Sequence, residues 1–119
     1  MDTPVPTLRG RKVLITGAAS GIGEATARAA AAEGAELVLT DLRADRLDEV
    51  VADINRSDGS VVYHLAGDVS DYDWVRSFAD HVDAEVGTMD VVMNIAGVSA
   101  WGTVENLEHR HWRKMVDVN

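Results

Sequence analysis

The chain has 119 residues, 46% hydrophobic and 26% charged, which suits one folded domain and is too short for two. Twenty Asp and Glu against eleven Lys and Arg give a formal net charge of -9, which disfavours a nucleic-acid partner because its phosphates would be repelled. The absence of cysteine excludes disulfides, thiol nucleophiles and cysteine metal sites.

The N-terminal segment carries no targeting signal. Its first ten residues, MDTPVPTLRG, hold an Asp and two Pro where a signal peptide needs a basic start and an apolar core. No run of about 18 apolar residues occurs, since charged residues and a glycine interrupt the Ala-rich stretch from Ala25 to Ala35. We therefore expect a cytoplasmic protein with no membrane partner, and the lack of cysteine is compatible with that compartment.

Short apolar runs alternate with longer helical stretches along the chain. The runs predict strands at Lys12–Thr16, Glu36–Asp41, Val61–Ala66 and Asp90–Ile95. The stretches between and after them predict helices at Ile22–Glu33, Asp45–Arg56, Asp71–Val86 and Val104–Val118. This alternation is typical of βαβ units, so we expect an α/β fold with a parallel sheet and helices on both of its faces.

Side-chain spacing supports two of these helices and marks where helices begin and end. Gly34 stands where a left-handed residue would end the first helix, and Ser70 or Asp71 is placed to cap the third. In the second helix, apolar residues recur at i, i+3, i+4 and i+7, namely Leu47, Val50, Val51 and Ile54. The third helix has a similar apolar stripe, formed by Trp74, Val75, Phe78 and Val82.

A glycine-rich turn, TGAASGIG, joins the first strand to the first helix. Such a turn is an anion site, because unpaired backbone amides and the positive end of the helix dipole face it. Gly17 would permit a sharp exit from the strand, Gly21 the approach of a pyrophosphate, and Gly23 close packing of the helix on the sheet. Asp41 ends the second strand about 20 residues further on, as a dinucleotide-binding fingerprint requires.

This glycine spacing resembles the Thr-Gly-x-x-x-Gly-x-Gly fingerprint of the short-chain dehydrogenase/reductase family. Three further family motifs follow in order: Asp68-Val69, where the family contacts adenine; Asn94 to Gly97, which resembles Asn-Asn-Ala-Gly; and Asn119, which resembles the Asn of the catalytic tetrad. The resemblance implies a Rossmann-type doubly wound parallel sheet. This chain would hold the N-terminal part of that single domain, residues 1–119, with its first four strands in the order 3-2-1-4 and flanking helices.

The resemblance also implies roles for individual residues. Asn119 is the catalytic candidate, because in the family this Asn holds a water through its backbone carbonyl and passes protons to a Lys. Asp68 has a structural alternative, since a carboxylate between a strand and a helix often accepts hydrogen bonds from nearby backbone amides. Asn94 also has one, because it could tie the fourth strand to the neighbouring strands. The cofactor would be held by Gly17, Ser20, Gly21, Ile22, Gly23, Asp41, Leu42, Asp68, Val69, Asn94, Ala96 and Gly97.

The acidic residue at the end of the second strand favours NAD as the cofactor. The Asp41 carboxylate can accept hydrogen bonds from both adenosine ribose hydroxyls and would repel a 2′-phosphate. Relatives that use NADP place a basic residue just before the second loop glycine, where this chain has Ser20, or just after the second strand. Arg43, two residues beyond Asp41, leaves NADP use open.

Other polar and aromatic groupings have simpler explanations than a functional site. His109 and His111 lie two residues apart, so on a helix they point about 200° away from each other and form a polar face rather than a metal site. Asp68, Asp71 and Asp73 lack the glycine and bidentate Glu of a calcium loop, and helix capping explains them better. A substrate pocket could be lined by the last group, Trp101, Trp112 and Met115, because loops after the fourth strand lie at the carboxyl end of the sheet, but packing in a core or interface is the simpler expectation.

The family's acid/base motif, Tyr-x-x-x-Lys, does not occur in these residues. The only tyrosines, Tyr63 and Tyr72, are followed four residues later by Gly67 and Arg76. We therefore expect an inactive N-terminal portion of a longer enzyme that moves hydride between NAD(H) and a secondary alcohol or ketone. A non-catalytic dinucleotide-binding or regulatory module is the alternative, and sequence beyond Asn119 would separate the two.

A methyltransferase-like nucleotide site is disfavoured by the long loop spacing and the later motifs.

The strand at Asp90–Ile95 would form a sheet edge with the apolar centre Val91-Val92-Met93 and no protecting Lys or Pro. We therefore expect a homo-oligomer, or association with the other half of the enzyme, through this edge or the last helix.

Overall fold

The computed structural model describes residues 3–119; Met1 and Asp2, part of the segment from which the lack of a signal peptide is argued, lie outside the described residues. One parallel sheet forms the centre of the molecule, with its strands in the order β3-β2-β1-β4. This is the predicted order 3-2-1-4. The strands are β1 (Lys12–Thr16), β2 (Glu36–Asp41), β3 (Ser60–Ala66) and β4 (Val91–Asn94).

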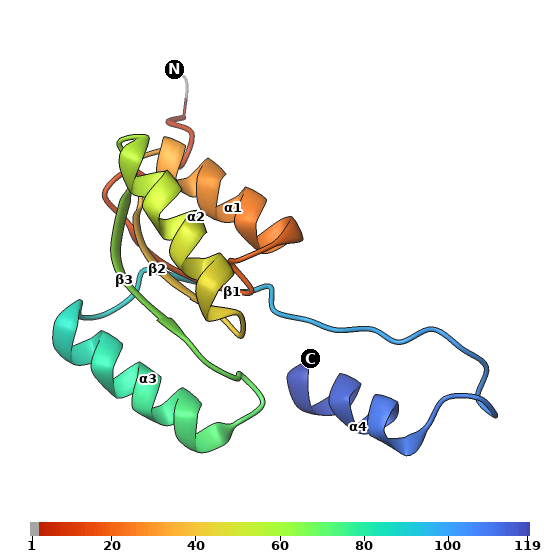
Figure 1. Ribbon diagram of the computed structural model, residues 1–119. Coiled ribbons are helices and arrows are strands. Elements are labelled where there is room, and N and C mark those ends of the chain that lie inside the picture. The colour runs from red at the N-terminus through yellow and green to blue at the C-terminus, as the bar shows by residue number, and fades with distance from the viewer. Residues whose placement is uncertain (1–2) are drawn as a thin grey trace.

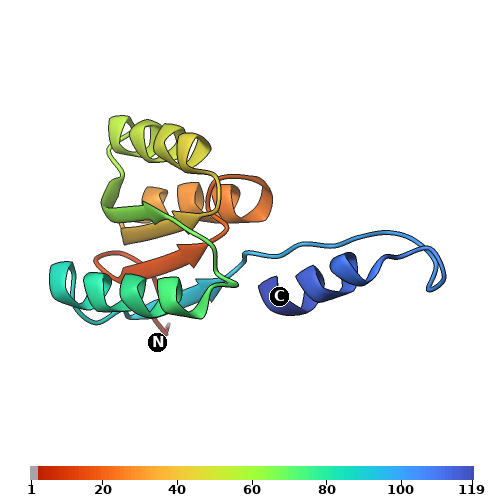
Figure 2. The same ribbon diagram turned by 60° about the horizontal axis from the view of Figure 1, so that its bottom comes forward.

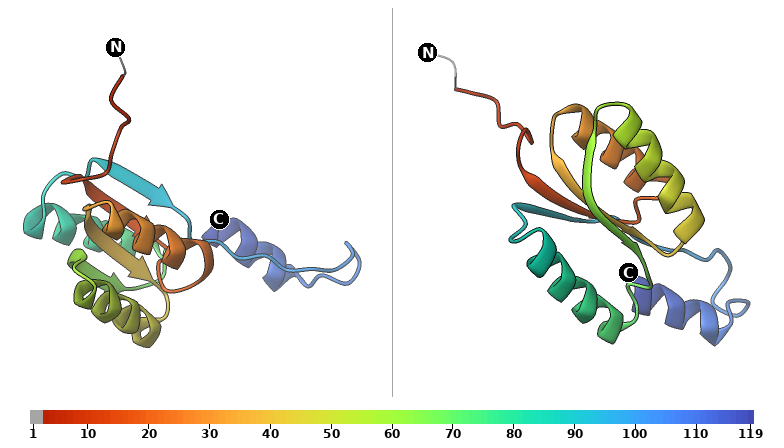
Figure 3. Two further views of the ribbon diagram at one scale, coloured as in Figure 1. Left: turned by 90° about the horizontal axis from the view of Figure 1, so that it is seen from above. Right: turned by 60° about the vertical axis from the view of Figure 1, so that its left-hand side comes forward.

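Helices cover both faces of the sheet, as the predicted doubly wound fold requires. Figures 1 and 2 show α1 and α2 on one face and α3 on the other. A fourth helix, α4, lies apart from the sheet at the end of a long extended segment, which Figure 3 shows from two sides. The helices are α1 (Gly21–Ala32), α2 (Ala44–Arg56), α3 (Tyr72–Glu85) and α4 (His109–Val118).

The two faces of the sheet are packed to different extents. The face under α1 and α2 has a dry core in which Val13, Ile15 and Leu39 from the strands meet Leu47 and Val50 from α2, all fully buried. The face under α3 has a smaller buried cluster of Val38, Phe78 and Val82. No residue of α4 is buried. The sheet is therefore sealed on one face and only partly covered on the other.

The strand ends line up at the carboxyl edge of the sheet. Thr16 of β1 pairs in register with Thr40 of β2 and with Asn94 of β4, and Asp41 pairs with Ala66 of β3. In a parallel sheet, the loops that leave these ends meet on the same side. The register therefore brings together the segments that carry most of the predicted site.

The predicted boundaries agree with the structure to within one residue, except at the start of the last helix, and several of the differences have local causes. β4 ends at Asn94, because the Ile95 and Ala96 amides donate to the Thr16 hydroxyl, at 3.0 and 3.1 Å, instead of continuing the ladder. Asp71, not Ser70, caps α3 by accepting the Asp73 and Trp74 amides. Gly34 has φ +90° and follows α1 as predicted.

The helix predicted from Val104 begins only at His109. The Asn106 and Leu107 amides both donate to the Thr103 carbonyl, at 3.1 Å each, and so close a separate turn before it. Val104 is 78% exposed and packs on nothing that would favour a helix there. Trp101 is 94% exposed, so it does not pack in the core of the described residues, and its packing in an interface stays a prediction.

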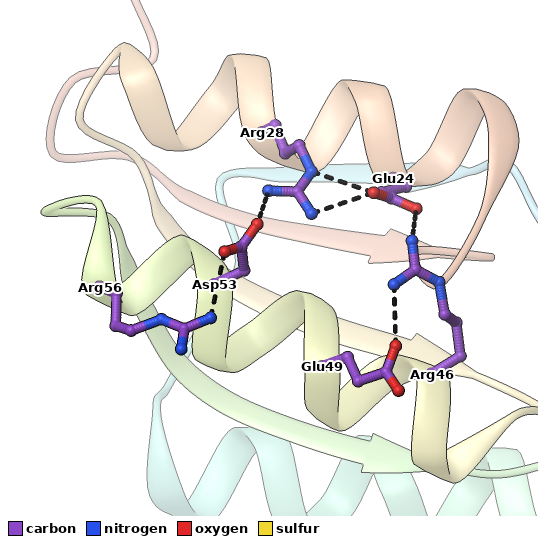
Figure 4. A network of polar contacts seen from close by, with 6 residues as sticks. All are labelled: Glu24, Arg28, Arg46, Glu49, Asp53 and Arg56. Carbon is purple, nitrogen blue, oxygen red and sulfur yellow. Dashed lines mark hydrogen bonds and ion pairs between the residues drawn. The ribbon is translucent and has the colours of Figure 1, made fainter.

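An ion-pair network joins α1 to α2 and fixes the two helices against each other (Figure 4). Glu24 of α1 accepts from Arg28 at 3.0 Å and from Arg46 of α2 at 2.6 Å. Arg28 also donates to Asp53 at 2.6 Å, and Arg56 donates to the other oxygen of Asp53 at 3.2 Å. The hydrogen bond from Arg28, and after it the one from Arg56, lowers the pKa of Asp53 below its ordinary value of 3.8.

Asp53→Asn is expected to lower the thermal midpoint at pH 7 and to have no effect in strong acid. A carboxylate whose folded pKa is depressed stabilises the fold above its ordinary pKa, and that contribution is lost as the pH falls through the folded value. The wild-type and variant midpoints, followed by circular dichroism, should therefore converge below about pH 3.8. Asp80→Asn, on the exposed surface of α3, is the control; a deficit in Asp53→Asn that persists unchanged into acid would contradict this account.

Candidate functional site

A cleft of ≈ 890 Å³ opens at the carboxyl edge of the sheet, between the glycine-rich turn and α4. Asn94, one of the twelve predicted cofactor-binding residues, lies outside it and lines a neighbouring hollow together with Asn119. The other eleven line the cleft: Gly17, Ser20, Gly21, Ile22, Gly23, Asp41, Leu42, Asp68, Val69, Ala96 and Gly97.

The glycine-rich turn folds tightly against its surroundings. Gly17 has φ +71°, and a Cβ there would lie 2.8 Å from the Ala96 backbone. A Cβ on Gly23 would overlap the Gly17 carbonyl oxygen. Gly23 therefore lets the first turn of α1 lie directly against the residue that follows β1. A Cβ on Gly21 would meet no atom within 4 Å, so this residue faces open space in the cleft.

The first turn of α1 presents free backbone donors to the cleft. Ser20 is the N-cap residue but makes no side-chain cap bond, whereas Asp71 caps α3 with two. The first amides of a helix have no partner within the helix. Together with the helix dipole, these amides make the turn suitable for an anion.

The Asp41 carboxylate stands beside the turn and is held by two backbone amides. Its Oδ2 accepts from the Ala19 amide and its Oδ1 from the Arg43 amide, each at 3.0 Å. A carboxylate can accept about four hydrogen bonds, so each oxygen can take one more. The Arg43 side chain also lines the cleft, and it forms no ion pair within residues 3–119.

Asp68 also lines the cleft, in the segment where β3 leads into α3. One of its oxygens, Oδ1, accepts from the Ser70 amide at 2.9 Å and from the Ser70 hydroxyl at 2.6 Å. The hydroxyl, and then the amide, lowers the pKa of this carboxyl. The alternative role of accepting nearby amides is therefore present, while Oδ2 has no hydrogen bond to a residue in the range 3–119.

Asn119 clamps the end of α4 to the segment that follows β4. Its Oδ1 accepts from the Val98 amide at 2.8 Å, and its Nδ2 donates to the Val98 carbonyl at 2.9 Å. Both polar groups of the side chain thus bind backbone next to Gly97. The backbone carbonyl of Asn119, to which the resemblance assigns its role, takes no part in these two bonds.

Several residues of the cleft were not predicted from the sequence. Thr16, which lines the neighbouring hollow, is buried, and its hydroxyl holds the segment that leads to Ala96 and Gly97 in the cleft. Three of the α4 residues that line the cleft, Arg110, Arg113 and Lys114, are cationic, and the sequence indicates only a polar helix face at His109 and His111. The lining residues not predicted include Arg43, Gly67, Ser70, Ile95, Val98, His109, Arg110, Arg113, Lys114, Asp117 and Val118.

Within residues 3–119, no three or more His, Asp or Glu side chains are grouped so that they could hold a metal ion. None of the helices in that range is long and apolar enough to cross a membrane.

Comparison with known proteins supports the resemblance. The short chain dehydrogenase family matches residues 11–119. An uncharacterized oxidoreductase of Bacillus subtilis, YxbG, is 42% identical over 96 residues, which cover 80% of this chain and 34% of that protein. D-threitol dehydrogenase of Mycolicibacterium smegmatis is 38% identical over 112 residues, which cover 94% of this chain and 43% of that enzyme. The chain thus spans less than half the length of these relatives.

Solved structures agree with the sequence relatives. A short chain dehydrogenase/reductase from Burkholderia phymatum in complex with NAD has a TM-score of 0.88 and 30% identity, covering 96% of this chain and 40% of that one. L-sorbose reductase from Gluconobacter frateurii, complexed with NADPH and L-sorbose, has a TM-score of 0.87 and 30% identity, covering 94% of this chain and 43% of that one. The matched sequence and the shared fold agree, and the chain belongs to the short chain dehydrogenase family of oxidoreductases.

Proposed function

We propose that this chain is the N-terminal part of a single NAD-binding domain, in an enzyme that moves hydride between NAD(H) and a secondary alcohol or ketone. The observation that carries the proposal is the Asp41 carboxylate, which lines the cleft beside the glycine-rich turn with hydrogen-bonding capacity to spare. Vicinal ribose hydroxyls are donors that such a carboxylate can accept.

The rest of the cleft fits the remaining parts of a dinucleotide. Gly21 faces open space next to the uncapped amides of α1, which suits a pyrophosphate. Asp68 and Val69 line the end of the cleft near β3, where the adenine would lie, and Ala96 and Gly97 line the end near β4. When bound, the nicotinamide supplies or accepts the hydride. The residues of this chain bind the dinucleotide and orient it.

NAD is expected to bind at least tenfold more tightly than NADP. A carboxylate facing a 2′-phosphate repels it, and tenfold corresponds to only about 1.4 kcal/mol. Asp41→Asn keeps a hydrogen-bond acceptor for the Ala19 or Arg43 amide and removes the charge, so it should bring the two dissociation constants together. Isothermal titration with both cofactors measures this.

Arg43→Gln is the matched variant, because it removes the positive charge of Arg43, which lines the same cleft as Asp41. If the Arg43 guanidinium attracts the 2′-phosphate, this variant weakens NADP and leaves NAD unchanged, so that the preference for NAD increases. Equal affinities of wild type for NAD and NADP would overturn the assignment of NAD. An unchanged preference in Asp41→Asn would show that another residue determines it.

We also propose that the chain associates through the face around β4, with a second copy or with the other half of its enzyme. β4 is an edge strand, and Val92 on it is 56% exposed. Next to it, a hollow of ≈ 590 Å³ is lined by apolar side chains of the half-covered sheet face, α3 and the loop that joins α3 to β4, among them Leu14, Phe78, Val82, Met89 and Val92. Exposed apolar strands of this kind recruit other chains.

Light scattering of the 119-residue chain at micromolar concentration is expected to give a mass above its 12.8 kDa. Val92→Lys should shift it toward the monomer, because a charge then faces the apolar hollow. Val62→Lys is the matched control, since Val62 lies on the other edge strand, β3, and is 44% exposed. A monodisperse wild type at 12.8 kDa, or equal effects of the two variants, would contradict the proposal.

A further inference from the structure

Gly67 links the two carboxylates at the entrance of the cleft. It directly follows β3 and precedes Asp68, and its amide donates to the Asp41 carbonyl at 2.9 Å. Its position therefore sets how far Asp41 and Asp68 stand from each other. Any movement of Gly67 would move one of these residues against the other.

The indole ring of Trp74 lies directly against Gly67. A Cβ at Gly67 would overlap the Cε2, Cζ2 and Nε1 atoms of that ring, so only a glycine fits beneath it. The Trp74 ring in turn stacks on Phe78, with centroids 5.0 Å apart and planes inclined by 11°. Phe78 is buried in the cluster under the sheet. The indole is therefore held between Gly67 and the core.

The main chain of Trp74 is tied to the same segment. Its amide donates to Asp71 Oδ1 at 3.2 Å, and the Asp71 amide donates to the Asp68 carbonyl at 3.0 Å. Ser70 binds the Asp68 carboxylate. Residues 67–74 thus form a closed unit in which the ring at one end covers the glycine at the other.

We propose that Trp74 is a positioning residue for the adenosine end of the site. It acts through Gly67, which it holds in place, and so keeps the Asp41 and Asp68 carboxylates in register for ribose and adenine. The sequence pattern placed Trp74 only in an apolar helix stripe, but the structure puts its ring against the backbone that joins the two acids. The identity of the ligand in this inference rests on the proposed dinucleotide function, whereas the effect of Trp74 on Gly67 rests only on the contacts described above.

Amide hydrogen exchange tests the mechanism without any ligand. In Trp74→Leu, which removes the ring, the Gly67 amide is expected to exchange at least tenfold faster relative to the core amides of β1. Trp74→Phe keeps an aromatic ring over Gly67 and should stay near wild type. Val82→Ala is the matched control, because it removes packing from the same cluster two turns further along α3 and should leave Gly67 protected. Equal Gly67 exchange in Trp74→Leu and Val82→Ala would overturn the proposal.

Calorimetric titration tests the consequence for binding, with ADP-ribose and nicotinamide mononucleotide as the probes. Trp74→Leu should bind ADP-ribose about tenfold more weakly, the effect of losing one hydrogen bond to a charged group, and bind nicotinamide mononucleotide as wild type does. Val82→Ala should bind both probes as wild type does. An unchanged ADP-ribose affinity in Trp74→Leu would overturn the role. A wild type that binds no ADP-ribose would refute the dinucleotide function, while hydrogen exchange still decides the role of Trp74.

Discussion

Replacing Gly23 with alanine is expected to lower the free energy of unfolding by about 3 kcal/mol or more, the upper range for forcing an extra methyl into a packed site. The added methyl would overlap the Gly17 carbonyl oxygen. That oxygen belongs to the backbone and cannot rotate aside as a side chain can, so the whole turn must shift. Urea denaturation, followed by circular dichroism, measures the loss.

Gly21→Ala is the control for this prediction, because it adds the same methyl to the same turn. A Cβ there meets no atom within 4 Å, and only its φ of +53° carries a cost, about 1–2 kcal/mol. Gly21→Ala should therefore stay folded at 25 °C and still lose affinity for the dinucleotide, because the methyl enters the space proposed for the pyrophosphate. If the two variants lose equal stability, the tight contact of Gly23 with Gly17 does not have the role assigned to it.

The parts of the fold that the sequence predicts best are the central strands. β1 and β2 agree with the prediction at both ends, because a strand covered on both faces is a continuous apolar run between polar turns. β4 is shorter than predicted by one residue at each end. Asp90 accepts the Lys12 amide with its side chain, and Thr16 takes the amides beyond Asn94. Contacts between residues almost 80 positions apart leave no local signal in the sequence.

The candidate site divides in the same way. The turn at Gly17–Gly23, Asp41 and Asp68 could be placed because each follows a strand, and parallel strands end at a common edge. The α4 wall with Arg110, Arg113 and Lys114 could not be placed, since a long connection without periodicity precedes it. Trp74 shows a third case: its apolar spacing correctly predicts burial against Phe78, but spacing carries no information about the contact with Gly67.

The 119 residues by themselves are expected to bind NAD and to turn over no alcohol or ketone. Hydride transfer at a carbinol carbon requires a group that takes the hydroxyl proton, and positioned proton transfer contributes about 10² to 10⁴ in rate. Neither tyrosine of the chain can serve. Tyr63 packs against Phe78, with ring centroids 6.1 Å apart, and Tyr72 is 73% exposed at the start of α3; neither lines the cleft.

The measurement is NADH formation by a purified, mass-verified chain over a panel of secondary alcohols, beside a calorimetric titration of NAD on the same sample. Binding without turnover is the expected pair of results. Rates proportional to protein concentration and above background would show that a group within these residues does the proton transfer. The Asn119 carbonyl is no such group, because a neutral amide oxygen can hold a water but does not take its proton.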